Sequence, residues 1–107
     1  MRAGDLKHRI TIQEKEVTRG TAGGEDITWT AVATVWAAAE PIRGREYTAL
    51  RAAQSEVTIR FRIRYRSDVD TAMRVLWKSV AYEIVEAINV NAENEELQLL
   101  CAGPANG

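Results

Sequence analysis

The chain has 107 residues and a formal net charge of −1 at pH 7. We predict one domain spanning residues 1–107, because this length supports one hydrophobic core but not two. The near-zero charge argues against a general affinity for nucleic acid, since nucleic-acid-binding domains are usually strongly basic. A single cysteine, Cys101, excludes an internal disulfide and fits a reducing compartment. With neither a signal-peptide pattern nor a run of about 20 apolar residues, we expect a soluble protein, made inside the cell, with no membrane partner.

Residues 8–18 are the first predicted strand. Ile10 and Ile12 alternate with polar residues, and the charged residues 14–16 indicate that the far end leaves the core. The glycine-rich segment 19–26 predicts a mobile hairpin loop. A phosphate-binding loop is not expected there, because no Gly-Lys-Ser/Thr follows and no helical pattern begins.

Residues 27–41 are the second predicted strand, since Trp29, Val32, Val35 and Trp36 favour β structure and a proline closes the segment. Alanines at 37–39 suggest a helix as the weaker alternative. Both faces of this strand carry apolar or small residues. We therefore expect both faces to be covered, by the sheet's own fold or by another subunit.

Residues 42–54 have a helical pattern, in which Tyr47, Leu50 and Ala53 recur at three-residue spacing. A helix of about ten residues is marginal in isolation, because nucleation is costly and few hydrogen bonds follow it. We expect this segment to need a partner surface.

Residues 56–66 alternate strictly between apolar and polar, which is typical of a strand with one buried face. At about 3.3 Å per residue the run extends roughly 36 Å, which predicts a long, bent strand shared by two sheets or running through a small barrel. The apolar face comprises Val57, Ile59, Phe61, Ile63 and Tyr65, and the polar face Glu56, Thr58, Arg60, Arg62, Arg64 and Arg66.

The remainder of the chain predicts three more strands. Residues 73–77 and 80–89 flank a tight turn at Lys78 and Ser79, and residues 95–101 follow an asparagine-rich loop at 89–94. Residues 67–71 are a predicted turn and 102–107 a flexible tail. The predicted fold is mainly β, a small antiparallel barrel or sandwich of six or so strands, with one short helix between the second and third strands.

Catalytic chemistry finds little support in the sequence. His8 is the only histidine, and Cys101 lies on an apolar face, where a cysteine usually behaves as a small hydrophobe. No histidine or cysteine spacing predicts a zinc site. We expect neither an enzyme nor a bound cofactor or metal; a small enzyme built around Cys101 is the remote alternative.

The four arginines at 60, 62, 64 and 66, here called the arginine face, allow several interpretations. They are solvated, or they pair across strands with acids such as Glu96. A subunit interface and a track along nucleic-acid phosphates are the alternatives. The nucleic-acid interpretation is weakened because Phe61 and Tyr65 lie on the opposite face, whereas stacking on bases requires aromatics beside the arginines.

The order and spacing of several segments resemble the head–tail adaptor, or head-closure, proteins of long-tailed bacteriophages, whose members join the phage head to its tail. The resemblance covers nearly the whole chain and rests on residues 1–13, 29–37, 41 with 44–47, 60–66, 73–76, 82–84 and 96–101. The chain departs from the usual pattern at Lys78 and Ser79, where relatives often have a glycine-rich turn.

This resemblance implies a structural β-barrel subunit that forms a ring, commonly twelvefold, at the head–tail junction of the virion. Such a ring would contact itself, the portal or adaptor ring above and tail-terminator or tail proteins below. Packaged DNA would pass through its lumen without being read. The chain would reside in the host cytoplasm before assembly.

The resemblance also implies that residues 42–54 project as an assembly or channel segment, with Arg43, Arg45, Tyr47 and Leu50 as candidate residues. The alternative function is a monomeric β-barrel nucleic-acid-binding module that uses Arg60, Arg62, Arg64 and Arg66.

Overall fold

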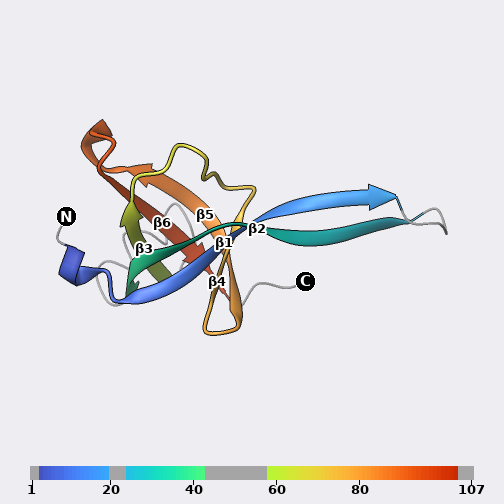
Figure 1. The fold of residues 1–107 in the computed structure, drawn as a ribbon, viewed down its shortest axis with the longest axis horizontal. Coiled ribbons are helices and arrows are strands. Elements are labelled where there is room, and N and C mark those ends of the chain that lie inside the picture. Colours follow the sequence, from blue (N-terminus) through green and yellow to red (C-terminus); the bar gives the residue numbers. More distant parts are fainter. Residues whose placement is uncertain (1–2, 20–23, 43–57, 104–107) are drawn as a thin grey trace.

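Six antiparallel strands close into a barrel in the order β1-β2-β3-β6-β5-β4 (Figure 1). The structure is a computed structural model that describes residues 3–19, 24–42 and 58–103. The mainly β antiparallel barrel expected from the sequence is thus confirmed. Of the helix expected at residues 42–54, residues 43–54 lie outside the described residues, and Ile42 is not helical. The strands are β1 (His8–Arg19), β2 (Glu25–Pro41), β3 (Ile59–Arg64), β4 (Arg74–Trp77), β5 (Val80–Asn89) and β6 (Glu96–Ala102), with short 3-10 helices η1 (Ala3–Asp5) and η2 (Val90–Ala92).

The barrel interior is filled by the inward-facing residues of all six strands. Phe61 is fully buried at its centre, with its ring edge-to-face against Trp77 and Tyr82 at centroid distances of 5.5 and 5.6 Å. Such aromatic contacts add to the stabilisation from buried area. The predicted alternation is confirmed on β3, where every second residue is buried. The buried cluster comprises Ile10, Ile12, Ala37, Ile59, Phe61, Ile63, Val69, Val75, Ile84, Leu97, Leu99 and Cys101.

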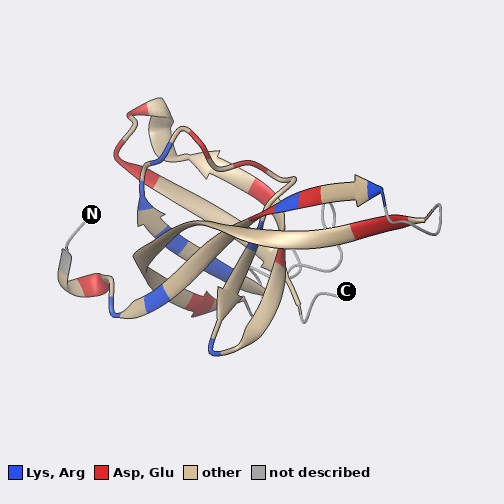
Figure 2. Cartoon of the chain, turned by 45° about the vertical axis from the view of Figure 1, so that its right-hand side comes forward, with Lys and Arg blue, Asp and Glu red and all other residues tan. Residues whose placement is uncertain are grey.

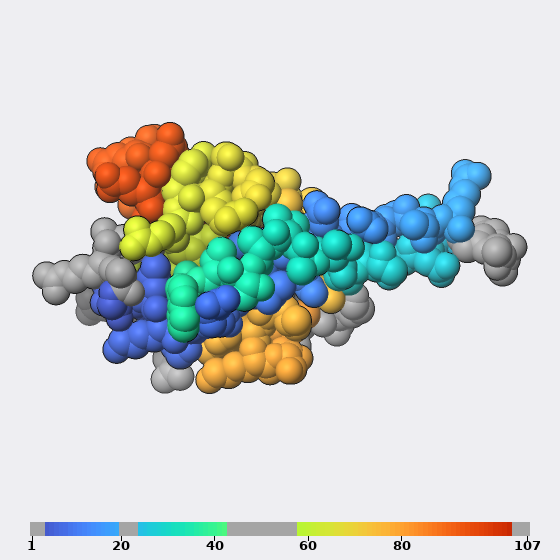
Figure 3. Space-filling view, in the orientation of Figure 1, coloured from blue at the N-terminus to red at the C-terminus, as the bar shows by residue number. Residues whose placement is uncertain are grey.

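The hairpin of β1 and β2 continues well beyond the barrel. The neighbouring strand β4 pairs with β1 only over Thr11–Gln13, and β3 pairs with β2 only from Ala37 to Pro41. Residues 14–19 and 25–31 therefore form a two-stranded projection, here called the arm, which gives the molecule a length of 48 Å against 29 and 26 Å in the other directions (Figures 1 and 3). The arm confirms the expectation that the far end of the first strand leaves the core.

The expectation that both faces of residues 27–41 are covered is not met by the chain's own fold. Most of β2 before Ala37 is exposed or only partly buried. The physical reason is that this part of β2 pairs with β1 alone and has no second layer of the sheet over it. The other alternative, that a second subunit covers this part of β2, stays a prediction.

The strand expected at residues 56–66 is shorter than predicted. β3 has 6 residues and is flanked by hydrogen bonds from Thr58 N to Cys101 O at 2.9 Å and from Tyr65 N to Glu95 O at 3.0 Å. After it the chain turns at residues 67–68, where the Arg66 guanidinium donates two hydrogen bonds to Asp68, although the alternation predicted strand as far as residue 66. The long strands of this fold are β1 and β2, with 12 and 17 residues.

The last three strands follow the prediction closely. Lys78 and Ser79 form the tight turn between β4 and β5 with φ of 51° and 64°, values that favour Asn and Gly in two-residue hairpins. Ala102, expected in the tail, belongs to β6 and pairs with Glu83. No helix in the described part of the chain is long and apolar enough to cross a membrane.

Candidate functional site

The arginine face meets carboxylates from both neighbouring strands. Glu40 on β2 accepts hydrogen bonds at Oε1 from Arg60 Nε at 3.0 Å and from Arg62 Nε at 3.1 Å. Arg62 also reaches Glu96 on β6, from Nη1 to Oε1, at 3.3 Å. The register explains the arrangement, because Glu40 lies directly opposite Arg60, and Glu96 lies one diagonal step from Arg62.

These contacts change the acid–base properties of the groups involved. Burial alone would raise the pKa of Glu40, but the hydrogen bonds from Arg60 and Arg62 together with their charges lower it below its usual value. Burial alone would lower the pKa of Arg62, and its bonds to Glu40 and Glu96 outweigh that effect and raise it. The two carboxylates thus hold two arginines in fixed positions on the barrel wall, and little of their charge is left for phosphate groups.

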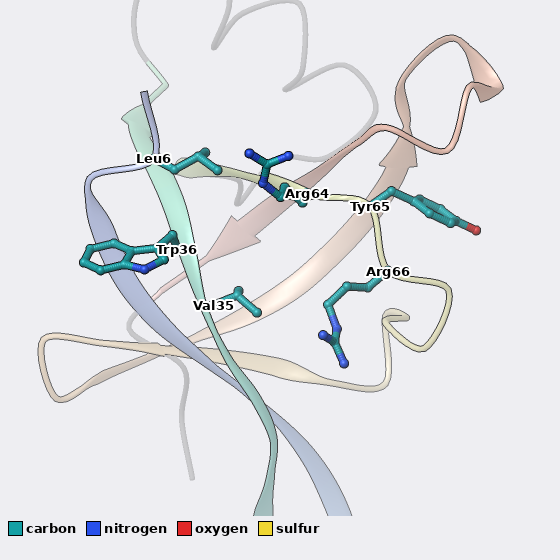
Figure 4. Close-up of a pocket in the computed structure, with 6 residues that line it drawn as sticks. All are labelled: Leu6, Val35, Trp36, Arg64, Tyr65 and Arg66. Atoms are coloured by element: carbon teal, nitrogen blue, oxygen red, sulfur yellow. The ribbon is translucent and has the colours of Figure 1, made fainter. Parts of the chain in front are cut away.

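The other two arginines border a pocket. Arg64 and Arg66 lie beside a cavity of about 600 Å³ between the edge of β2 and the end of β3. In Figure 4, Val35 on β2 faces the side of Arg66, whereas the Trp36 ring lies on the opposite side of the strand. The pocket is therefore apolar inside and basic at its border, and it is lined by Leu6, Val35, Trp36, Arg64, Tyr65 and Arg66.

The two border arginines differ in their partners. Arg66 forms a two-pronged ion pair with Asp68, with Nε–Oδ1 and Nη2–Oδ2 distances of 3.1 and 2.9 Å. The hydrogen bond from Arg66 is the main cause that lowers the pKa of Asp68. Arg64 is exposed and has no ion pair with any residue in the described ranges.

Cation–aromatic pairs cover the outside of the β1–β2 hairpin. The Arg9 guanidinium lies 4.8 Å from the centre of the Trp36 ring, and that of Arg74 lies 4.3 Å from Trp29. Trp36 nevertheless remains 50% exposed. Sequence reasoning did not assign these tryptophans to a surface, since strand propensity alone cannot tell a buried aromatic from an exposed one.

Cys101 is unsuited to nucleophilic chemistry. Its side chain is fully buried, and burial strongly raises the pKa of its thiol. A catalytic cysteine needs an accessible thiolate, which this environment disfavours. The described residues contain no cluster of three or more potential metal ligands. The candidate channel residues Arg43, Arg45, Tyr47 and Leu50 lie outside the described residues, and their role stays a prediction.

We compared the sequence of this barrel and arm with known protein families. The family model described as phage head completion protein matches residues 1–104. The chain belongs to the phage head completion protein family. Membership confirms the resemblance found in the sequence, and it gives this head completion protein a structural, head-related role as a component of the virion.

Two solved structures share the fold. The solution structure of protein SF1141 from Shigella flexneri 2a is similar with a TM-score of 0.75 and 26% identity, covering 100% of each chain. A chain in the virion of a native gene transfer agent particle is similar with a TM-score of 0.61 and 18% identity, covering 94% of this chain and 97% of that one. The second likeness concerns the fold alone. No curated protein matches the sequence significantly.

Proposed function

We propose that this head completion protein is a structural adaptor that assembles into a ring at the head–tail junction. The ring would extend the DNA channel of the portal, help to retain the packaged genome and provide the platform on which the tail docks. The observation that carries this proposal is the family match over residues 1–104. We infer no chemical reaction, because adaptor function requires only binding surfaces.

The partners follow from this position. Copies of the chain would contact one another, a portal or adaptor ring would lie above them, and tail-terminator or tail proteins would lie below. Packaged DNA would cross the lumen without sequence reading. The pairing of Arg60 and Arg62 with Glu40 and Glu96 supports this last point, since neutralised arginines contribute little to phosphate binding.

The monomeric nucleic-acid-binding module is the competing function, and no contact in the described residues favours it. Of its four arginines, Arg60, Arg62 and Arg66 already contact carboxylates. A nucleic-acid track would also require aromatic residues on the same face, whereas Phe61 is buried inside the barrel.

The test is to mix the purified chain with portal-bearing, DNA-filled capsids of its phage and to image them by electron microscopy. We expect an additional ring at the portal vertex and slower loss of DNA to added nuclease than in untreated capsids. Absence of the ring, together with salt-sensitive binding of the chain to free DNA, would overturn the proposal in favour of the nucleic-acid module.

A further inference from the structure

We propose that the arm of one copy docks into the arginine-bordered pocket of the next copy, so that the ring is built from head-to-tail contacts. This inference rests on the proposed ring and names the two surfaces that would form it. The surfaces are the arm, residues 14–19 and 25–31, and the pocket between β2 and the end of β3.

The face of β1 that is apolar in the barrel becomes acidic in the arm. On the barrel, Ile10 and Ile12 of β1 face inward and are buried. Side chains alternate along a strand, so Glu14 and Glu16 continue that inward face, and Val17 lies on the outer one. On β2, Ile27 pairs with Val17, and the register of the two strands shifts by one residue after Ile12.

The apolar side of the arm is consequently left exposed. Val17 and Ile27 are each 51% exposed, and with Trp36 they are the large hydrophobic residues that stand out on the described surface. A two-stranded hairpin is marginal in water without a further strand or surface against it. On this side the barrel covers Trp29 through Arg74 but leaves Val17 and Ile27 exposed.

Charge complementarity indicates what covers the arm. Its other side carries the acidic residues Glu14, Glu16 and Asp26, of which the last pairs with Thr18 across the hairpin. Lys15 and Arg19 lie on the opposite side, with Val17. Figure 2 shows acidic and basic segments along the arm and basic segments on the barrel. The pocket combines apolar walls with Arg64, which has no ion pair with any residue in the described ranges, whereas the charge of Arg66 is already offset by Asp68. An acidic and apolar hairpin therefore matches the pocket through Arg64 and its apolar walls.

The arm cannot reach the pocket of its own chain. Ile27 and Val35 belong to the same strand and are eight residues apart, which is roughly 26 Å in extended conformation. The paired hairpin cannot fold back over that distance. The occupant must be the arm of a second copy, and a contact between two different surfaces repeats from copy to copy until it closes into a ring.

The free edge of β2 beside the pocket offers backbone groups to the same occupant. Within the described ranges, β2 has no strand on its outer edge before Ala37. Exposed edges of this kind readily accept an added strand. The hydrogen bonds gained there would fix the arm in register, while the arginines select its acidic side.

Cysteine cross-linking within assembled rings tests the contact. Thr28 lies on the acidic side of the arm and Val35 lines the pocket, and a cysteine is smaller than the side chain at either position. The doubly substituted chain, Thr28→Cys with Val35→Cys, would be bound to capsids and treated with a short bismaleimide. The buried Cys101 should not react, so the unsubstituted chain measures the background.

We expect a ladder of dimers, trimers and larger species, because a head-to-tail contact propagates around the ring, whereas a two-fold contact would stop at dimers. The matched control, Glu93→Cys with Val35→Cys, places its first cysteine in the exposed loop at η2 and should give no ladder. Rings that form without a ladder, or with the arm cysteine linked to a portal or tail protein, would overturn this inference and leave the ring intact. Capsids without any added ring would overturn the proposed function and the inference with it.

Charge exchange gives a second, independent readout. Glu16→Arg and Arg64→Glu should each weaken ring formation at least tenfold, and the chain carrying both changes should recover most of it. Both side chains are exposed, so the melting temperature of the free chain should not move. Single variants that assemble as well as the unsubstituted chain, or a double variant without recovery, would contradict the contact between the acidic side of the arm and the pocket.

Discussion

The strands β1 and β2 run through both the barrel and the arm, but their side chains are packed differently in the two regions. In the barrel, β1 buries Ile10 and Ile12 against all the other strands. In the arm, six consecutive residues of β1 are exposed. The two strands stay paired on both sides of the boundary, where the register shifts by one residue after Ile12, and the surface available for packing changes there. The comparison teaches that the barrel is stabilised within one chain, whereas the arm leaves large apolar side chains exposed, which in our proposal a second copy covers.

The largest expected effect is on the barrel. Phe61→Ala removes the ring that contacts Trp77 and Tyr82 and leaves a cavity in the core. We expect the free energy of unfolding to fall by about 3–5 kcal/mol, measured by urea denaturation. A loss below about 1 kcal/mol would show that the barrel does not depend on this packing.

A smaller effect is expected from the barrel's ion pairs. Glu40→Gln removes the charge that both Arg60 and Arg62 contact, and we expect a loss of about 1 kcal/mol, since the carboxylate is partly exposed. The folded-state pKa of Glu40 is lowered from 4.5, so its contribution is present above that pH and is lost as the pH falls further.

The stability difference between the unsubstituted chain and Glu40→Gln should therefore shrink below about pH 4.5, as measured by urea denaturation at several pH values. The matched control is Asp68→Asn, whose partner Arg66 is more exposed than Arg62, and it should have less effect. A difference that grows at low pH would contradict the lowered pKa of Glu40.

A substitution in the turn between β4 and β5 should instead stabilise the free chain. Ser79 has φ of 64°, a conformation that glycine adopts without strain. Ser79→Gly should raise the free energy of unfolding by about 0.5–1 kcal/mol. Ser67→Gly, in the exposed turn after β3, serves as a control with no positive φ to relieve. Destabilisation by Ser79→Gly would show that the turn conformation differs from the one described.

The smallest effect on the free chain is expected in the arm. Replacing both Val17 and Ile27 by serine should change the free energy of unfolding by no more than about 0.5 kcal/mol, because each is half exposed. Ring formation on capsids should nevertheless be impaired. A large drop in the melting temperature of the free chain would mean that the arm is part of the stabilising core.

Local alternation made most of the barrel predictable from the sequence. Ile59, Phe61 and Ile63 alternate with arginines, and the structure buries all three. The end of β3 was not predictable in the same way. The alternation continues to Arg66 and the predicted turn begins at residue 67, whereas β3 already ends at Arg64.

The partners of the arginine face could be predicted only in part, because they depend on how strands distant in the sequence pair with one another. Glu96 could be named as a partner for the arginine face, but Glu40 could not, because its position opposite Arg60 depends on the register of β2 and β3. The pocket combines residues from three segments that are distant in the sequence. Nothing in the sequence indicates that Leu6 and Val35 line the same pocket. The exposure of Trp36 was equally hidden, since both faces of its strand are apolar or small.

Hydrogen exchange of the free and the assembled chain tests the difference between barrel and arm most directly. In the free chain, the amides of residues 14–19 and 25–31 should exchange far faster than those of β3 and β6. In the ring, the arm amides should become protected while the barrel amides stay as they were. Arm amides that are already protected in the free chain, or that remain unprotected in the ring, would contradict the account that assembly completes the arm.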